Sequence, residues 1–181
     1  DLFIIHLAAF TNIDLAEDNP ELAYNVNKIG TKNIAHIARK HNIPILYVST
    51  NNVFDGNSST PYKTTDATNP INVYGKSKLD GELAVSSILE KYFIVRIAWV
   101  FGHNGKNFIK TMINVGKTHD TVRVVNDQIG TPTYTKDLAR LLVDMVKKDK
   151  YGYYHATNEG GDISWYDFCC EFYMQYGLDT K

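Results

Sequence analysis

The sequence predicts an α/β protein built on a doubly wound parallel sheet, and two observations carry this prediction. Short apolar runs of strand length alternate with segments of helical periodicity along the whole chain. The strand-like runs are continuously apolar, as in residues 45–48, which is typical of strands buried on both faces of a parallel sheet. No repeat, linker or low-complexity block interrupts this alternation.

The first half of the chain contains three expected strands and two expected helices. Residues 2–9 form the first strand, and Asn19-Pro20 then supplies an N-cap followed by proline in the first helical turn. Apolar residues recur every three or four positions from Leu22 to Ala38, which predicts a helix that ends near Lys40. The remaining expected elements are a strand at 45–49, a polar loop at 51–70, a helix at 74–87 and a strand at 93–98.

The second half repeats the alternation with shorter elements. Ser164 and Asp167 resemble a capping box and predict the start of a final helix. The other expected elements are a helix at 107–115, a strand at 122–125, a helix at 135–147 and a strand at 153–156.

Composition and charge exclude several functional classes. The 181 residues carry a formal net charge of −1, which argues against a nucleic-acid-binding protein. No apolar run reaches the length of a membrane span, and the opening apolar run lacks the basic start of a signal peptide. Cys169 and Cys170 are adjacent, which suits neither a disulfide framework nor a zinc site, and we expect thiols in a reducing, cytoplasmic compartment. The six histidines show no metal-ligand spacing.

Tyr74 and Lys78 have the spacing that places two side chains on one face of a helix. A cation beside a phenol stabilises the phenolate and lowers the phenol's pKa, which makes tyrosine a usable proton donor near neutral pH. Chance alone predicts about one Tyr-x-x-x-Lys pair in a chain of this composition, so the spacing by itself is weak evidence. A second pair, Tyr24 and Lys28, lies inside a long amphipathic helix. For that pair, two side chains on the exposed face of the helix are the simpler interpretation.

Hydroxyl groups end the second expected strand. Ser49 and Thr50 lie where a parallel sheet presents groups to a ligand, and a hydroxyl there can donate a hydrogen bond to a carbonyl oxygen that gains negative charge. Capping of the following loop is the alternative role for both residues.

Seven segments, in order along the chain, resemble the extended short-chain dehydrogenase/reductase family, and within it the dTDP-4-dehydrorhamnose reductases. The segments are residues 8–14, 25–33 (Asn25-Val-Asn27, Gly30-Thr31 and Asn33), 49–56, 69–78, 96–102, 125–132 and 152–155. The resemblance implies a Rossmann-type fold with a small interleaved substrate-binding part. It implies a partial dinucleotide-binding domain at 1–102, a substrate-side segment at 103–134, a return to the dinucleotide-binding domain at 135–158, and the start of a substrate-side C-terminal part at 159–181.

The resemblance also implies roles for individual residues. Tyr74 would protonate the oxygen of a C4 ketone on a nucleotide-bound sugar, Lys78 would lower the pKa of Tyr74 and hold the nicotinamide ribose, and Thr50 would polarise the carbonyl. The cofactor would be NADPH or NADH. The implied cofactor-binding residues are Ala8, Ala9, Ser49, Tyr74 and Lys78, and the implied substrate-binding residues are Asn51, Asn52, Trp99, Asn107 and Gln128, with Asp127 nearby. For Trp99 a place in the core is the alternative.

Two departures from the family pattern stand out. Asn51 and Asn52 occupy positions where the family usually has aspartate and tyrosine, and an amide can hydrogen-bond but cannot exchange a proton as a carboxylate does. The glycine-rich turn that cradles a pyrophosphate is also absent, since Gly30 is the first glycine in the chain. The resemblance therefore implies that this chain is a fragment that lacks both ends, the glycine-rich βαβ unit at the start and a piece of similar size at the C-terminus. We expect it to bind no nicotinamide dinucleotide alone.

The expected function is reduction of the C4 ketone of dTDP-4-dehydrorhamnose in deoxysugar and cell-surface polysaccharide biosynthesis. The alternatives are a sugar-nucleotide epimerase or dehydratase and a non-catalytic regulatory relative, the latter favoured by Asn51 and Asn52. The resemblance implies a nucleotide-sugar partner and admits a homodimer. The charge, the apolar runs and the histidine spacing described above lead us to expect no nucleic acid, membrane or metal.

Overall fold

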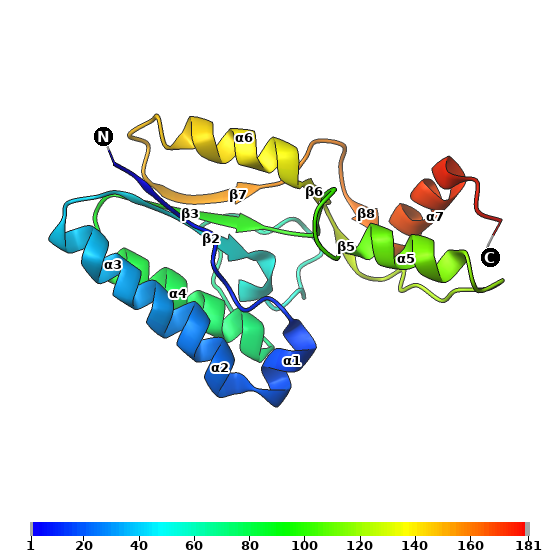
Figure 1. The fold of residues 1–181 in the computed structure, drawn as a ribbon, viewed down its shortest axis with the longest axis horizontal. Coiled ribbons are helices and arrows are strands. Elements are labelled where there is room, and N and C mark those ends of the chain that lie inside the picture. Colours follow the sequence, from blue (N-terminus) through cyan, green and yellow to red (C-terminus); the bar gives the residue numbers. More distant parts are fainter. Residues whose placement is uncertain (1, 180–181) are drawn as a thin grey trace. The chain divides into compact units, whose positions relative to one another are not determined.

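The computed structural model describes residues 2–179, which form two compact units (Figure 1). The first unit contains the chain up to Ile97 together with Leu142–Ala156. The second contains Ala98–Leu141 and the chain from Thr157 onward. No helix in this described range is long and apolar enough to cross a membrane.

A four-stranded parallel sheet forms the centre of the first unit. Its strands lie in the order β1-β2-β3-β7, and each pairs with its neighbours in parallel. The carboxyl ends of the strands therefore meet at one edge, where ligands bind in sheets of this kind. The parallel sheet confirms the predicted α/β class. The strands are β1 (Ile4–His6), β2 (Ile45–Thr50), β3 (Tyr92–Ile97) and β7 (Gly152–Ala156).

Helices α3 and α4 lie side by side against one face of this sheet (Figure 1). They bury Ala35 and Val85 against Ile45, Tyr47 and Ile94, all fully inaccessible to solvent. Each large apolar side chain in this cluster contributes roughly 1.5–3 kcal/mol through burial. The helical elements of the first unit are α1 (Ile13–Asp18), α2 (Pro20–Tyr24), the π-helical turn η1 (Asn25–Gly30), α3 (Thr31–Lys40), the 3₁₀ turn η2 (Asn51–Val53) and α4 (Val73–Ile88).

The helix predicted over 20–40 is continuous but not uniform. The π-helical turn η1 joins α2 to α3 and places Asn27 in the interior with no exposed surface. Single π-helical turns inside α-helices occur frequently at functional sites.

The strand predicted over 2–9 is shorter and less buried than expected. Only Ile4–His6 forms a strand, and Ile5 and Leu7 are 38% and 63% exposed. β1 lies at the edge of the described sheet, and successive side chains of a strand point to opposite faces. His6 is buried while its neighbour Ile5 is exposed, so the expectation of burial on both faces is wrong for the described residues.

The second unit contains two helices and two short two-stranded ladders, with β4 and β6 parallel and β5 and β8 antiparallel. Its core packs Ile113 against Cys169, Phe172 and Tyr173. Helix α6 (Thr135–Met145) runs from the second unit into the first. The other elements are β4 (Val100–Phe101), α5 (Phe108–Gly116), β5 (Ile129–Gly130), β6 (Thr133–Tyr134), β8 (Ile163–Ser164) and α7 (Trp165–Tyr176).

The start of α7 confirms one prediction and corrects another. Ser164 Oγ accepts the Asp167 N–H at 2.9 Å, as the capping-box resemblance predicts. The strand predicted at 122–125 is absent, because the carbonyl of Val125 accepts the N–H of Tyr166 in α7 at 3.0 Å instead of a strand partner.

Candidate active site

Polar side chains gather at the carboxyl edge of the sheet in the first unit. Thr50, 4% exposed, ends β2, and Ala8 and Ala9 follow the end of β1. Because β1 and β2 are parallel, these residues share one edge. Tyr74 lies in the first turn of α4, which Asn72 caps by accepting the Gly75 N–H.

The Thr50 hydroxyl lies close enough to the Tyr74 phenol to affect its ionisation. Burial raises the pKa of Tyr74, and hydrogen bonding with the Thr50 hydroxyl lowers it in part. A hydrogen bond to a phenolate stabilises the charged form, so the Thr50 hydroxyl favours proton release from Tyr74.

Lys78 is 2% exposed and donates to the Val48 carbonyl at 2.8 Å, with its ammonium 4.0 Å from the centre of the Tyr47 ring. Burial lowers the pKa of Lys78 to about 7, while the Glu82 carboxylate raises it in part. Its hydrogen bond goes to a backbone carbonyl instead of the Tyr74 phenol. An ammonium has three N–H groups, and a ligand hydroxyl would fit those that Val48 does not use.

The lowered pKa of Lys78 predicts a pH-dependent stability in the complete protein without cofactor. Between pH 7 and about 10 the unfolded chain holds a proton on this amine that the folded chain lacks, so stability rises with pH across this window. Lys78→Met removes this contribution. Between about pH 7 and about pH 9, the urea midpoint should rise less in the variant than in the parent. Equal increases in the two proteins would contradict a lowered pKa for Lys78.

Asn27 is a buried residue to which the sequence analysis gave no role. Its Nδ2 donates to the Phe10 carbonyl at 3.0 Å and to Ser77 Oγ at 2.9 Å, and its Oδ1 accepts the Phe10 N–H at 2.8 Å. Ser77 Oγ donates in turn to the Tyr74 carbonyl at 2.8 Å. Asn27 therefore ties the segment after β1 to the helical turn that carries Tyr74. The only signal in the sequence was its place in one of the seven segments.

Asn51 and Asn52 surround the Thr50 hydroxyl. Thr50 Oγ1 accepts both the backbone N–H and the Nδ2–H of Asn52, each at 3.1 Å, and donates its own hydrogen to Asn51 Oδ1 at 3.4 Å. Ser49 is buried, and its Oγ has no hydrogen-bond partner within the described residues. The structure thus brings the two amides to Thr50, and cofactor binding by Ser49 stays a prediction.

Three predicted substrate-binding residues lie in the second unit. Trp99 has a φ of +48°, a strained backbone for a bulky residue, and its ring stacks on Trp165 at 3.6 Å between centroids. Asn107 caps α5 by accepting the Lys110 N–H at 3.2 Å, and its Nδ2 donates to the Gly102 carbonyl. The Gln128 side chain is exposed. Substrate contacts of all three stay predictions.

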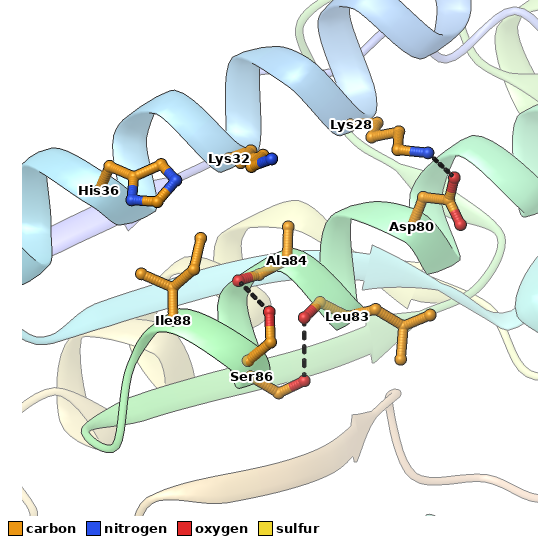
Figure 2. Close-up of a pocket in the computed structure, with 9 residues that line it drawn as sticks. Lys28, Lys32, His36, Asp80, Leu83, Ala84, Ser86 and Ile88 are labelled. Carbon is orange, nitrogen blue, oxygen red and sulfur yellow. Dashed lines mark hydrogen bonds and ion pairs between the residues drawn. The ribbon is translucent and has the colours of Figure 1, made fainter.

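A groove of about 600 Å³ lies between α3 and α4 on the helical face of the first unit (Figure 2). Lys28, Lys32 and His36 line one side of it, and Lys28 forms an ion pair with Asp80 at 2.7 Å. None of the predicted site residues lines this groove, so it is not the candidate active site.

The chain matches one protein family over residues 1–181, described as the RmlD substrate binding domain. A curated relative, the dTDP-4-dehydrorhamnose reductase of Aggregatibacter actinomycetemcomitans, is 46% identical over 171 residues, which is 91% of this chain and 58% of the relative. The chain therefore spans about three fifths of the length of such relatives.

Two solved structures are similar along almost the whole chain. A dTDP-4-dehydrorhamnose reductase from Clostridium acetobutylicum is 46% identical, with a TM-score of 0.95 over 99% of this chain and 63% of that one. The enzyme from Bacillus anthracis, solved in complex with NADP, is 40% identical with the same TM-score and the same coverage.

Proposed function

Because the chain belongs to the RmlD family of sugar-nucleotide reductases, we propose that the complete protein reduces the C4 ketone of dTDP-4-dehydrorhamnose to dTDP-rhamnose with NADPH or NADH. The observation that carries this proposal is the cluster of Thr50, Tyr74 and Lys78 at the carboxyl edge of the parallel sheet. The NADP in the Bacillus anthracis structure supports a phosphorylated nicotinamide cofactor.

Each residue of the cluster has one task in this reaction. A bound nicotinamide supplies hydride to the C4 carbon. Tyr74 donates its proton to the ketone oxygen, and the Thr50 hydroxyl stabilises the charge that passes between these two oxygens. Lys78 holds the nicotinamide ribose through the N–H groups that Val48 does not use, and Ala8, Ala9 and Ser49 form the neighbouring wall.

Nicotinamide absorbance, followed in the complete protein with the keto-sugar nucleotide, tests the proposal against its alternatives. Stoichiometric oxidation of NADPH or NADH supports the reductase. Conversion of the sugar without net oxidation would point to an epimerase or dehydratase. A folded protein that converts no sugar would be a non-catalytic relative, which Asn51 and Asn52 favour.

The double substitution Asn51→Asp with Asn52→Tyr tests the two amides. Restoring the acid and the phenol should raise the rate of dTDP-4-dehydrorhamnose reduction, because a carboxylate and a phenol can take part in proton exchange where amides cannot. If the amides suit a different 4-keto sugar, the rate on that sugar should fall in the same variant. Unchanged steady-state rates on every 4-keto sugar nucleotide would show that both positions are peripheral.

A further inference from the structure

Lys78 keeps an amine in the interior of the first unit with few polar contacts. The residue is 2% exposed, so water is almost excluded from the charge. Among the described residues its Nζ makes one hydrogen bond, to the Val48 carbonyl at 2.8 Å. A buried charge is costly unless other groups compensate for the lost water. The Tyr47 ring offers such compensation, because Nζ lies over it at 4.0 Å from its centre and a ring face attracts cations within about 6 Å.

The Tyr47 ring is itself held in place by neighbouring strands. Tyr47 has no exposed surface, and along β2 it pairs with His6 of β1 on one side and Ile94 of β3 on the other. The His6 ring lies against it, with 5.4 Å between the ring centroids. The ring and the Val48 carbonyl come from consecutive residues of β2, so one short piece of strand supplies both contacts to the Lys78 ammonium.

Gly81 allows α4 to approach this ring. A Cβ at position 81 would lie 2.4 Å from the Tyr47 hydroxyl oxygen and 3.0 Å from the ring carbon that carries it, which is closer than such atoms can pack. Gly81 and Lys78 are three positions apart on α4 and therefore lie on one side of the helix. The lack of a side chain at position 81 thus lets the side of α4 that carries Lys78 lie against Tyr47.

The charged groups near Lys78 do not replace the ring. Glu82, one turn further along α4, accepts two hydrogen bonds from the Arg96 guanidinium, at 2.9 and 2.7 Å, so its charge is shared with that cation. Burial and the Lys78 charge lower the pKa of His6 to about 4, so the imidazole is neutral near pH 7. A ring face attracts the ammonium without adding a further buried charge.

We propose that Tyr47 is a positioning residue whose ring keeps the Lys78 amine charged and holds it where the proposed cofactor ribose binds. The proposal deepens the proposed function and rests on it for the identity of the ligand. Attraction to the ring favours the ammonium over the neutral amine and so opposes the effect of burial. An ammonium has three N–H groups, so those that Val48 does not use stay available to a ribose hydroxyl.

A fluorination series at position 47 of the complete protein separates attraction from packing. Tyr47→Phe is the reference, followed by 4-fluoro-, 3,5-difluoro- and 3,4,5-trifluorophenylalanine at the same position. Each fluorine withdraws electron density from the ring face and weakens its attraction for a cation, while the ring keeps nearly the same size. Tyr47→Leu removes the ring altogether and keeps an apolar side chain, and it serves in place of any fluorinated variant that does not fold.

The first measurement is the pKa of Lys78, followed by NMR of isotope-labelled lysine side chains without substrate or cofactor. Lys78→Met identifies the signal. The pKa should fall in steps along the series, by on the order of one pH unit in all, and at least as far in Tyr47→Leu. A pKa that varies by less than about 0.3 unit across these variants would overturn the proposal.

Phe93 supplies the matched control. It is 1% exposed on the neighbouring strand β3 and packs against the rings of Tyr151 and Tyr154, at 5.1 and 5.9 Å between centroids. The same fluorinated residues at position 93 should leave the pKa of Lys78 unchanged. Every variant of the series retains the titratable and charged groups around Lys78, which are Tyr74 and Glu82 on α4, His6 on β1 and Arg96 on β3.

The second measurement is the calorimetric dissociation constant for NADPH at about pH 8, where the Lys78 amine is mostly neutral in the free protein. The constant should rise in the order of fluorination by about threefold to tenfold. In a Lys78→Met background the series should have no effect, whereas a merely structural ring would lower affinity and the urea midpoint together in both backgrounds.

The two measurements also separate this proposal from the proposed function. The NMR titration needs neither cofactor nor turnover, so it decides whether the ring holds the ammonium even if the complete protein reduces no keto sugar. If the pKa of Lys78 follows the series and the affinity for NADPH does not, Lys78 does not hold the ribose, and the positioning role of Tyr47 is overturned.

Discussion

Tyr74→Phe should abolish turnover in the complete protein while leaving cofactor affinity almost unchanged. The variant removes one oxygen, and with it the proton donor for the ketone. Loss of a general acid lowers rates by about 10²- to 10⁴-fold. The phenyl ring keeps the packing of the first turn of α4, so the fold is retained. Initial rates of nicotinamide oxidation and a calorimetric titration with NADPH measure the two effects separately.

The chain offers a matched control in its second Tyr-x-x-x-Lys pair. Tyr24 stands beside Lys28 with the ammonium 5.7 Å from its ring centre, but Lys28 is committed to the ion pair with Asp80. Tyr24→Phe should therefore leave kcat within about twofold of the parent. If Tyr74→Phe retained half of the parental activity, Tyr74 would not be the proton donor.

Lys78→Met should differ from Tyr74→Phe in its effect on binding. Methionine keeps most of the apolar stem but lacks the ammonium over the Tyr47 ring and donates no hydrogen bond. Because Lys78 is proposed to hold the ribose, the calorimetric dissociation constant for NADPH should rise together with the loss of rate. An unchanged dissociation constant would leave Lys78 with a structural role alone.

The sequence was sufficient to predict most of the fold and the place of Tyr74 and Lys78 on one helix. Continuous apolar runs predicted β2 and β3, because strands buried on both faces leave a pattern that needs no tertiary information. The spacing of Tyr74 and Lys78 predicted a shared helical face for the same reason. What the sequence showed was local: which residues lie on one face of one element.

The features that sequence missed depend on contacts between distant segments. In the sequence, Asn27 looks like an ordinary polar position of an amphipathic helix. In the structure it lies in the π-helical turn η1 and is buried. Ile5 is 38% exposed although it lies in an apolar run, and no local pattern reports which face of a strand is left uncovered. The hydrogen bond from Asn72 Nδ2 to Asn52 Oδ1, at 3.2 Å, joins positions that are 20 residues apart.

The buried pair of Glu82 and Arg96 is the strongest example of a contact that the sequence does not reveal, since charged residues are normally expected at the surface. Here the Glu82 side chain is 1% exposed and that of Arg96 is 5% exposed. Glu82 accepts two hydrogen bonds from the Arg96 guanidinium, at 2.9 and 2.7 Å. The guanidinium also lies 5.0 Å from the Phe54 ring centre and 5.1 Å from that of Tyr153. Two charges are therefore held in the interior by one bidentate contact between α4 and β3.

Glu82→Gln should lower the free energy of unfolding of the complete protein by about 3–5 kcal/mol, because it leaves the Arg96 charge buried without a counter-ion. Arg96 Nη1 already has no hydrogen-bond partner within the described residues, so no other acceptor could replace Glu82. Replacing both residues together, as Glu82→Met with Arg96→Met, should cost less than either single change, since no unpaired charge remains. Urea unfolding of Glu82→Gln, Arg96→Met and the double variant measures these differences. The exposed pair of Lys147 and Asp144 at the end of α6 serves as the control, and Asp144→Asn should have little effect because solvent screens such pairs. If Glu82→Gln were as mild as Asp144→Asn, water would have to reach Arg96 in solution, and the pair would not be part of a dry core.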